Sequence, residues 1–229
     1  MYRHTWGVLV LLLMVCAGCV TILPPEQGDL LLFFSDFEDD EVGGAPSGVH
    51  VYNGNPVISD HFGRKTVYME HPNYETDYKG DSYYIAFEPQ TGIVSLELWA
   101  YMTGTNRSLN IIFASDYEAL NKYSTENCGV YLQFDRYGDL RALYMTEKQN
   151  WLKLADYEAN TWYHLRVEVD VASNTYDVYL NNNLVGTDVP FYGEQSSLNS
   201  VFIRLAHLRA EPMPPVYPVH IDSIRIERK

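Results

Sequence analysis

Short stretches in which apolar and polar residues alternate dominate the sequence after Val49. The alternation is clearest from Ile93 to Met102, from Gly129 to Asp135 and from Trp162 to Val171. Successive side chains of a strand point to opposite faces of its sheet, so each stretch predicts a strand with one core face. No segment shows a convincing period of an amphipathic helix. The chain is therefore predicted to fold as an all-β protein.

Turn signals separate these stretches at short intervals. Clusters of turn-forming residues occur at 137–139, 173–175 and 181–183, and again at Gly193. Strands joined by such short turns pair antiparallel, as the segment from Tyr176 to Leu180 would pair with the strand before it. About 200 residues suffice for one large β-domain, and no repeat or linker divides them. We predict a two-sheet antiparallel β-sandwich over residues 30–229.

The first eighteen residues have the pattern of an export signal. Arg3 and His4 form a basic head, and an apolar run of about nine residues follows from Gly7 to Val15. This run is too short to cross a hydrocarbon core, which takes about 20 helical residues. Small residues precede Cys19, and the segment resembles the signal of a bacterial lipoprotein, in which Cys19 would be lipidated. Cys16 stands where such signals usually have leucine, so plain secretory cleavage and an uncleaved anchor stay open as alternatives.

Residues 19–29 are predicted to form a tether between the lipid and the folded domain. Pro24 and Pro25 make this segment stiff and carry no amide donor. The resemblance implies a protein of the cell envelope, lipid-anchored to a membrane through Cys19 and extracytoplasmic. We expect it to be a monomer.

The charge of the chain excludes one class of partner. A formal net charge of -14 and a pI near 4.8 argue against nucleic acid, whose phosphates need a basic surface. Nineteen tyrosines and four tryptophans favour strands and flat surfaces that contact ligands. Cys128 stands alone in the folded part, and we predict that it is a small buried apolar residue rather than a nucleophile.

Five segments share the pattern of one known architecture. They are residues 36–39 (DFED), 44–48 (GAPSG), 162–170 (WYHLRVEVD), 175–181 (TYDVYLN) and 221–226 (IDSIRI). Together they resemble laminin-G-like domains of the concanavalin A-like lectin and glucanase superfamily, over nearly the whole chain after Leu30. The resemblance implies a jelly roll, a fold that lectins, binding modules, glycoside hydrolases and polysaccharide lyases share.

The same resemblance implies a structural calcium ion, Ca2+. Carbohydrate-binding jelly rolls of this superfamily often hold it between a carboxylate after the first strand and one in the last strand, the places of Glu38 and Asp222. Calcium prefers six to eight oxygen ligands at about 2.4 Å, which carboxylates and loop carbonyls supply. Asp36, Asp39 and Gly43 are weaker candidates for the same site. Alternatively, Glu38 lies on a solvated turn and Asp222 caps or pairs with Arg225.

A polar and aromatic surface is predicted opposite the core face of the strands. Its candidate ligand-binding residues are Glu97, Trp99, Tyr101, Tyr131, Gln133 and Arg141. Aromatic rings stack on the C–H faces of sugars, and carboxylate, amide and guanidinium groups bind their hydroxyls. If Ile93 to Met102 and Gly129 to Asp135 lie in one sheet, these side chains line a shared concave surface for a polysaccharide or glycan, with Trp151 and Arg204 as candidate neighbours. The alternative is an ordinary solvated face, or one covered by the loop 115–127.

No complete set of catalytic residues is present in the sequence. Laminarinase-like members of the superfamily carry three acids on one strand, and after Glu168 and Asp170 the third is missing. Tyr131, Gln133, Arg141 and His207 are residue types that a polysaccharide lyase uses, but they form no recognisable motif. We therefore predict a non-catalytic binding module for carbohydrate. A lyase or hydrolase on the same fold and a structural envelope protein are the alternatives.

Overall fold

A computed structural model of the protein describes residues 30–70, 79–105, 108–116, 127–145, 148–206 and 217–229. The regular elements in these ranges are β-strands, arranged in two antiparallel sheets. None of the described segments forms a helix that is long and apolar enough to cross a membrane. The predicted signal segment 1–18, Cys19, the tether and His207 lie outside the described residues, so their predicted roles stay predictions.

Eight strands form the first sheet, which we call sheet A. Seven of them follow the order β13-β12-β11-β6-β15-β4-β3. On one side of β15, β4 pairs with its first residues and β1 with its last residues. The bounds are β1 Leu30–Ser35, β3 Val57–His61, β4 Arg64–Met69, β6 Ile93–Met102, β11 Thr161–Asp170, β12 Thr175–Leu180, β13 Asn183–Pro190 and β15 Val219–Arg228.

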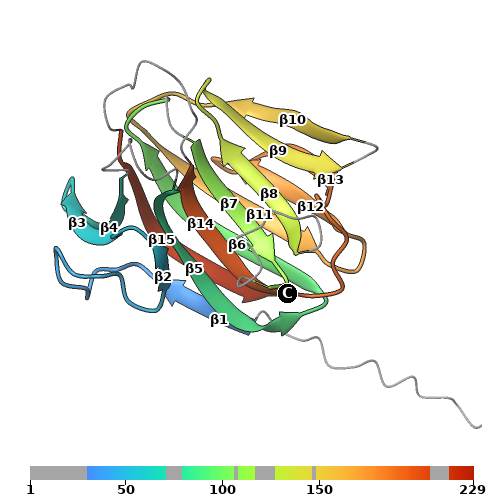
Figure 1. The fold of residues 1–229 in the computed structure, drawn as a ribbon, viewed down its shortest axis with the longest axis horizontal. Coiled ribbons are helices and arrows are strands. Elements are labelled where there is room, and N and C mark those ends of the chain that lie inside the picture. Colours follow the sequence, from blue (N-terminus) through green and yellow to red (C-terminus); the bar gives the residue numbers. More distant parts are fainter. Residues whose placement is uncertain (1–29, 71–78, 106–107, 117–126, 146–147, 207–216) are drawn as a thin grey trace, which may run out of the picture.

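Seven strands form the second sheet, sheet B, in the order β10-β9-β8-β7-β14-β5-β2. Their bounds are β2 His50–Asn53, β5 Lys79–Gln90, β7 Ser108–Ala114, β8 Cys128–Phe134, β9 Asp139–Met145, β10 Gln149–Asp156 and β14 Leu198–Ala206. Figure 1 shows the two sheets as two layers, with β7, β8 and β14 drawn over β6, β11 and β15. The predicted two-sheet sandwich is confirmed.

Local sequence explains where the strands begin and end. Strand β6 has the predicted bounds, and β8 and β11 begin and end one residue earlier than predicted. The strands β11 and β12 pair as predicted, and β13 pairs with β12 to complete a meander. Its turns pass through Asn174, Asn181 and Asn182, whose φ angles are 56°, 51° and 65°. Asparagine adopts this left-handed conformation more readily than most residues, which is why these turns form here.

The core lies between the sheets and consists of the apolar half of each alternating pattern. Leu96 and Leu98 of β6, Leu132 of β8, and Leu165 and Val167 of β11 are all fully buried. Burying one such side chain stabilises the fold by roughly 1.5–3 kcal/mol. Because the inward positions are taken by aliphatic residues, the alternate residues of the same strands must face outward.

The first and last strands lie side by side, since β1 pairs with β15. After β1 the chain turns at Phe37, whose φ is 59° and whose side chain is buried in the core. The loop that follows covers the edge strand β3. The amide of Gly43 donates to the carbonyl of Ile58 at 2.8 Å, and the amide of Ile58 donates to the carbonyl of Gly44 at 2.9 Å. These bonds occupy backbone groups that an edge strand otherwise exposes.

Candidate functional site

The structure separates the six predicted ligand-binding residues into two groups. Strand β6, with Glu97, Trp99 and Tyr101, belongs to sheet A, whereas β8 and β9, with Tyr131, Gln133 and Arg141, belong to sheet B. Their outward side chains therefore face opposite sides of the sandwich. The predicted shared surface was wrong, because β6 pairs with β11 and β15 while β8 pairs with β7 and β9.

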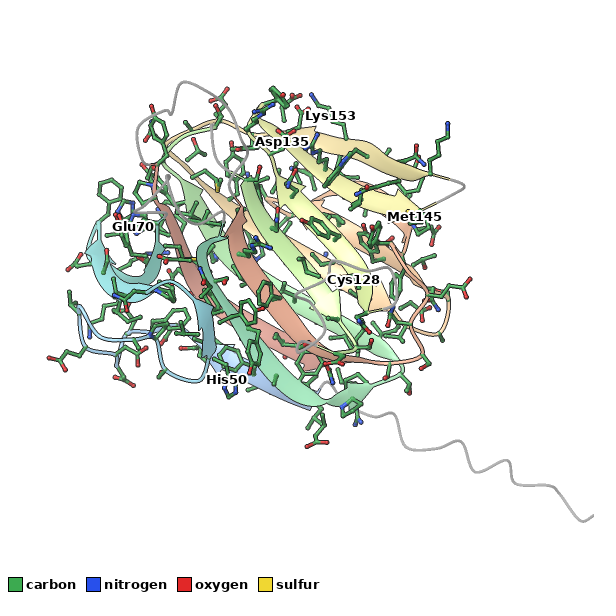
Figure 2. All side chains as sticks on the ribbon, viewed as in Figure 1. His50, Glu70, Cys128, Asp135, Met145 and Lys153 are labelled. Atoms are coloured by element: carbon green, nitrogen blue, oxygen red, sulfur yellow. The ribbon has the colours of Figure 1, made fainter. Side chains whose placement is uncertain are left out.

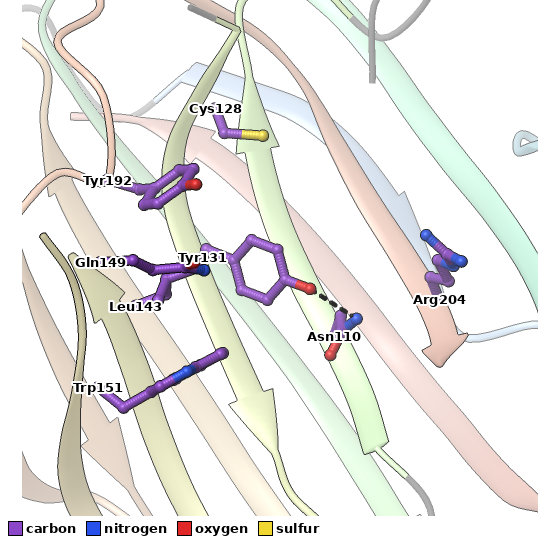
Figure 3. A pocket seen from close by; sticks show the side chains of 8 residues that line it. All are labelled: Asn110, Cys128, Tyr131, Leu143, Gln149, Trp151, Tyr192 and Arg204. Atoms are coloured by element: carbon purple, nitrogen blue, oxygen red, sulfur yellow. Dashed lines mark hydrogen bonds between the residues drawn. The ribbon is translucent and has the colours of Figure 1, made fainter. Parts of the chain in front are cut away.

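A cavity of about 330 Å³ lies on the outer face of sheet B, and we call it the sheet B pocket. It is lined by residues from five strands and from the loop after β13. They are Asn110, Cys128, Tyr131, Leu143, Gln149, Trp151, Tyr192 and Arg204. Figure 3 shows the ring of Tyr131 near the middle of this set, with its hydroxyl directed at Asn110. The pocket combines aromatic rings with amide and guanidinium groups.

The alternation of each strand explains why these side chains point outward. In β7, Leu109 and Ile111 belong to the core, so Asn110 between them faces the pocket. Tyr192 arrives differently, from a loop that crosses over from sheet A. Its amide donates to the carbonyl of Gly129 at 2.7 Å, which holds the loop against β8.

A chain of hydrogen bonds runs across three strands from the pocket. Asn110 Nδ2 donates to the hydroxyl oxygen of Tyr131 at 2.9 Å, and Gln133 Nε2 donates to Asn110 Oδ1 at 2.8 Å. Arg141 Nε and Nη2 both donate to Gln133 Oε1, at 3.1 and 2.6 Å. Each side chain in this chain therefore has a fixed orientation, which a preorganised binding surface requires.

An ion pair anchors the far end of this hydrogen-bond chain. Arg141 Nη1 lies 3.0 Å from Asp135 Oδ2, and the side chain of Asp135 is fully buried. Asp135 Oδ1 also accepts the amides of Tyr137 and Asp139, at 2.8 and 3.0 Å. Asp135 directly follows the last residue of β8 and is labelled in Figure 2. The guanidinium of Arg141 stacks over the Trp151 ring, 4.2 Å from its centroid, so it also orients a wall of the pocket.

The layer around the pocket is apolar and well packed. Ile112, Ala114, Cys128 and Phe202 are buried together on this face, apart from the main core. Burial raises the pKa of the Cys128 thiol to about 12, so the thiol stays protonated at neutral pH. Cys128 is thus the buried small residue that the sequence predicts, and it is not an activated nucleophile.

The two tyrosines of the pocket are neutral hydroxyl groups. Burial raises the pKa of Tyr131 well above its usual value, Cys128 and Tyr192 add to this, and Arg141 only partly offsets it. Burial likewise raises the pKa of Tyr192. A tyrosine with a raised pKa is a hydrogen-bonding group rather than a ready general base. The described part of the pocket is better suited to binding than to removing a proton.

The outer face of sheet A has a different character. Tyr101 is only 8% exposed and packs beneath the β3–β4 hairpin, with the His61 ring centroid 4.6 Å from its own. The Trp99 ring lies against His164 at 4.9 Å, and Glu97 lies 3.8 Å from His164 Nε2. These three predicted residues are therefore engaged with neighbouring side chains of their own sheet.

Glu38 and Asp222 come near each other, as the predicted calcium site requires. Burial raises the pKa of Asp222, and the charge of Glu38 adds to the rise, whereas Ser223 and Arg64 lower it. Arg64 Nη1 lies 3.4 Å from Asp222 Oδ2, and Lys65 donates to oxygens of Glu38. Within the described ranges, no three His, Cys, Asp or Glu residues cluster as a metal site would. As placed, these donors do not fit calcium.

Sequence reasoning named Trp151 and Arg204 only as possible neighbours and missed Asn110, Gln149 and Tyr192. A signal existed for Asn110, because it is an amide inside a run of otherwise apolar residues in β7. Tyr192 gave no such signal, since its position depends on how a loop from one sheet crosses to the other.

Comparison with known proteins identifies a family and solved structures that are similar to this chain. The family model described as the Concanavalin A-like lectin/glucanases superfamily (Laminin_G_3) matches residues 79–228. A sialidase superposes with a TM-score of 0.66 at 14% identity, over 86% of this chain and 18% of the sialidase chain. An alginate lyase gives a TM-score of 0.53 at 12% identity, over 88% of this chain and 96% of the lyase.

A botulinum neurotoxin type C, whose cell entry depends on interaction with two ganglioside molecules, gives a TM-score of 0.56 at 11% identity. That match covers 86% of this chain and 47% of the neurotoxin chain. The chain thus spans less than half of the sialidase and neurotoxin chains, and these low identities show the shared fold alone. No curated protein matches the sequence. Because the family match covers more than half of the chain, the protein belongs to the concanavalin A-like lectin/glucanases superfamily.

Proposed function

We propose that the protein is a non-catalytic carbohydrate-binding module whose binding site is the sheet B pocket. The observation that carries the proposal is the side-chain content of the pocket, in which aromatic rings and amides converge. Trp151 and Tyr192 offer flat surfaces for the C–H faces of sugars, and Asn110 and Gln149 offer amides for their hydroxyls. The edge-to-face contact of Tyr131 with Trp151, at 5.9 Å, keeps the two rings in fixed positions.

The charge of the pocket favours an acidic glycan, one that carries carboxylate groups. The chain has a net charge of -14, yet the residues that line the described part of the pocket include Arg204 and neither Asp nor Glu. Arg141, beside the pocket, neutralises the nearby buried carboxylate of Asp135. Guanidinium groups bind carboxylates in planar, charge-assisted pairs, so a uronate sugar matches this lining better than a cationic one.

The proposed location follows from the sequence. The signal-like residues 1–18 and Cys19 support a lipoprotein of the cell envelope that is anchored outside the cytoplasm by its lipid. Such a module would bind polysaccharide close to the membrane surface. Labelling with a radioactive fatty acid tests this: we expect incorporation that is lost in Cys19→Ala, and incorporation that persists in this variant would contradict the anchor.

Affinity electrophoresis tests the binding proposal directly. The gels would contain alginate or pectate as acidic polysaccharides and laminarin or xylan as neutral ones. We expect retardation in an acidic gel, lost in Trp151→Ala and kept in Trp99→Ala, because Trp99 lies on the opposite face. Failure of every polysaccharide to retard the wild-type protein would refute the proposal, and equal loss in both variants would refute the site.

Catalysis by a polysaccharide lyase is the second candidate function. Tyr131, Gln133 and Arg141 project from neighbouring strands, and an alginate lyase shares the fold over nearly its full length. A lyase removes the proton beside a uronate carboxyl group, breaks the glycosidic C–O bond, protonates the leaving oxygen and leaves a C=C bond. Absorbance of this unsaturated product, lost in Tyr131→Phe, would establish the lyase. If a polysaccharide binds and no unsaturated product forms, the lyase is refuted and the non-catalytic binding module is supported.

A further inference from the structure

The ammonium group of Lys65 lies in a cradle of backbone carbonyls. Lys65 is the second residue of β4, and its Nζ donates to the carbonyl of Glu38 at 2.6 Å and to the carbonyl of Asp40 at 2.8 Å. Both carbonyls belong to the loop between β1 and β2. One cation thus binds two oxygens of a loop that is distant from it in sequence.

The neighbouring oxygens are also used by donors of the protein. The Lys65 amide donates to Glu38 Oε1 at 3.2 Å. Asp222 Oδ2 pairs with Arg64 at 3.4 Å, and Asp222 Oδ1 accepts the hydroxyl of Ser223 at 3.0 Å. Calcium needs six to eight oxygens at about 2.4 Å, and two fixed positive charges beside it would repel it. The cluster has the oxygens of a cation site, and Arg64 and Lys65 supply the cations.

We propose that Lys65 is a built-in cation that replaces the structural calcium implied by the fold family, and that the protein folds independently of calcium. The ammonium ties the first loop to the β3–β4 hairpin, and the pair between Arg64 and Asp222 ties the same hairpin to β15. This inference does not depend on the proposed carbohydrate binding. Asp222 is the cross-strand partner of Trp99 on the outer face of sheet A, whereas the pocket lies on sheet B.

The loop has a physical need for such a cation. Phe37 turns inward with a positive φ, and the amide of Asp40 donates back to the carbonyl of Phe37 at 3.0 Å. In this tight turn the carbonyls of Glu38 and Asp40 both point to Lys65. Converging carbonyls repel one another, and a positive charge between them removes the repulsion.

Thermal unfolding of the full chain with added calcium and with a chelator is the first test. If the protein had a structural calcium site, a calcium concentration of about a hundredfold the Kd of that site would raise the melting temperature by several degrees. We expect the same melting temperature in calcium and in chelator. A rise in calcium that disappears in Glu38→Gln or Asp222→Asn would overturn the proposal.

Substitution of the lysine is the second test. We expect Lys65→Met to lower the melting temperature by roughly 4 °C or more. Lys153→Met is the matched control, because Lys153 also contacts two oxygens, of Asp139 and Asp156, but at an exposed edge of the other sheet. A fall no larger for Lys65→Met than for Lys153→Met would overturn the proposal.

Amine labelling of the wild-type protein is a third test that does not depend on how the variants fold. An ammonium held by two carbonyls reacts with an acylating reagent more slowly than an exposed one. We expect Lys65 to be modified at least about tenfold more slowly in the folded protein than in the urea-unfolded protein, as measured by peptide mass spectrometry. Equal rates in the two states would show that Lys65 is not held in the cradle.

Discussion

The two outer faces of the sandwich carry similar residues and use them differently. Sheet B places Tyr131, Trp151 and Arg141 around a pocket, with Arg141 paired to a fully buried carboxylate. Sheet A also presents tryptophan, tyrosine and arginine side chains. There, Tyr101 is covered by the β3–β4 hairpin, and Arg166 pairs with partly exposed glutamates.

The difference shows that burial, rather than residue type, decides what such groups do. Removing one partner of a charge pair shielded from water leaves the other charge buried without its counter-charge, which is costly, whereas an exposed pair is screened and contributes little. The sheet B face is therefore preorganised around a hollow. The sheet A face is a packed surface with several ion pairs. The following variants test this comparison.

Removal of one arginine from each face should give the largest contrast. Arg141→Leu leaves Asp135 buried and unpaired, so we expect the free energy of unfolding to fall by about 3 kcal/mol or more. Arg166→Leu removes pairs with Glu97 and Glu168, which are partly exposed, and we expect a loss of under about 1 kcal/mol. Urea unfolding measures both. Equal losses would erase the distinction between the faces.

Acid should destabilise the protein through His220, a buried histidine of sheet A. Burial lowers the pKa of His220 to about 4, and the charge of the stacked His61 adds to this. The ordinary value is about 6.5, so the unfolded chain binds more protons than the folded chain between these values. Stability is therefore fully present above about pH 6.5 and is lost as the pH falls towards 4, by up to roughly 3 kcal/mol.

The environment of His220 explains why its pKa is lowered, and a variant of this residue provides the control. Its Nδ1 lies 3.0 Å from Thr66 Oγ1, and the rings of His61, Tyr68 and Tyr101 surround it. Unfolding measured across this pH range should depend less on pH in His220→Gln. An unchanged pH dependence in the variant would mean that other groups titrate instead.

Loss of one hydroxyl in the sheet B pocket should have an intermediate effect. Tyr131→Phe removes the acceptor for Asn110, so we expect a loss of about 1 kcal/mol in unfolding free energy. Tyr179→Phe is the control on sheet A, where Arg166 lies over the Tyr179 ring and the face of the ring, not the hydroxyl, makes the contact. Equal losses of unfolding free energy in the two variants, measured by chemical unfolding, would show that the hydrogen-bond chain does not stabilise the fold.

Neutralising Glu97 should have the smallest effect. Its carboxylate lies 3.8 Å from His164 and 4.0 Å from Arg166, and its side chain is 41% exposed. We expect Glu97→Gln to change the free energy of unfolding by less than about 0.5 kcal/mol and to leave polysaccharide retardation unchanged. Lost retardation in this variant would move the binding site to sheet A.

Strand positions were predictable because they depend on local pattern. The bounds of β6 followed from alternation alone, and the turns at Asn174 and Asn181 followed from residues that tolerate positive φ. The candidate site was predictable only in part. Tyr131, Gln133 and Arg141 do lie close together, but Trp99 and its neighbours do not join them.

The sequence by itself determined the all-β class, the core face of each strand and the residue types available outside it, because side-chain direction in a strand depends only on parity. The nearness of Glu38 and Asp222 was implied by the family resemblance rather than by strand parity. The tertiary structure alone decided which strands share a sheet, since pairing joins residues far apart in sequence. It therefore decided that Tyr192 and Arg204 line the pocket of Tyr131, and that Lys65 reaches the carbonyls of Glu38 and Asp40.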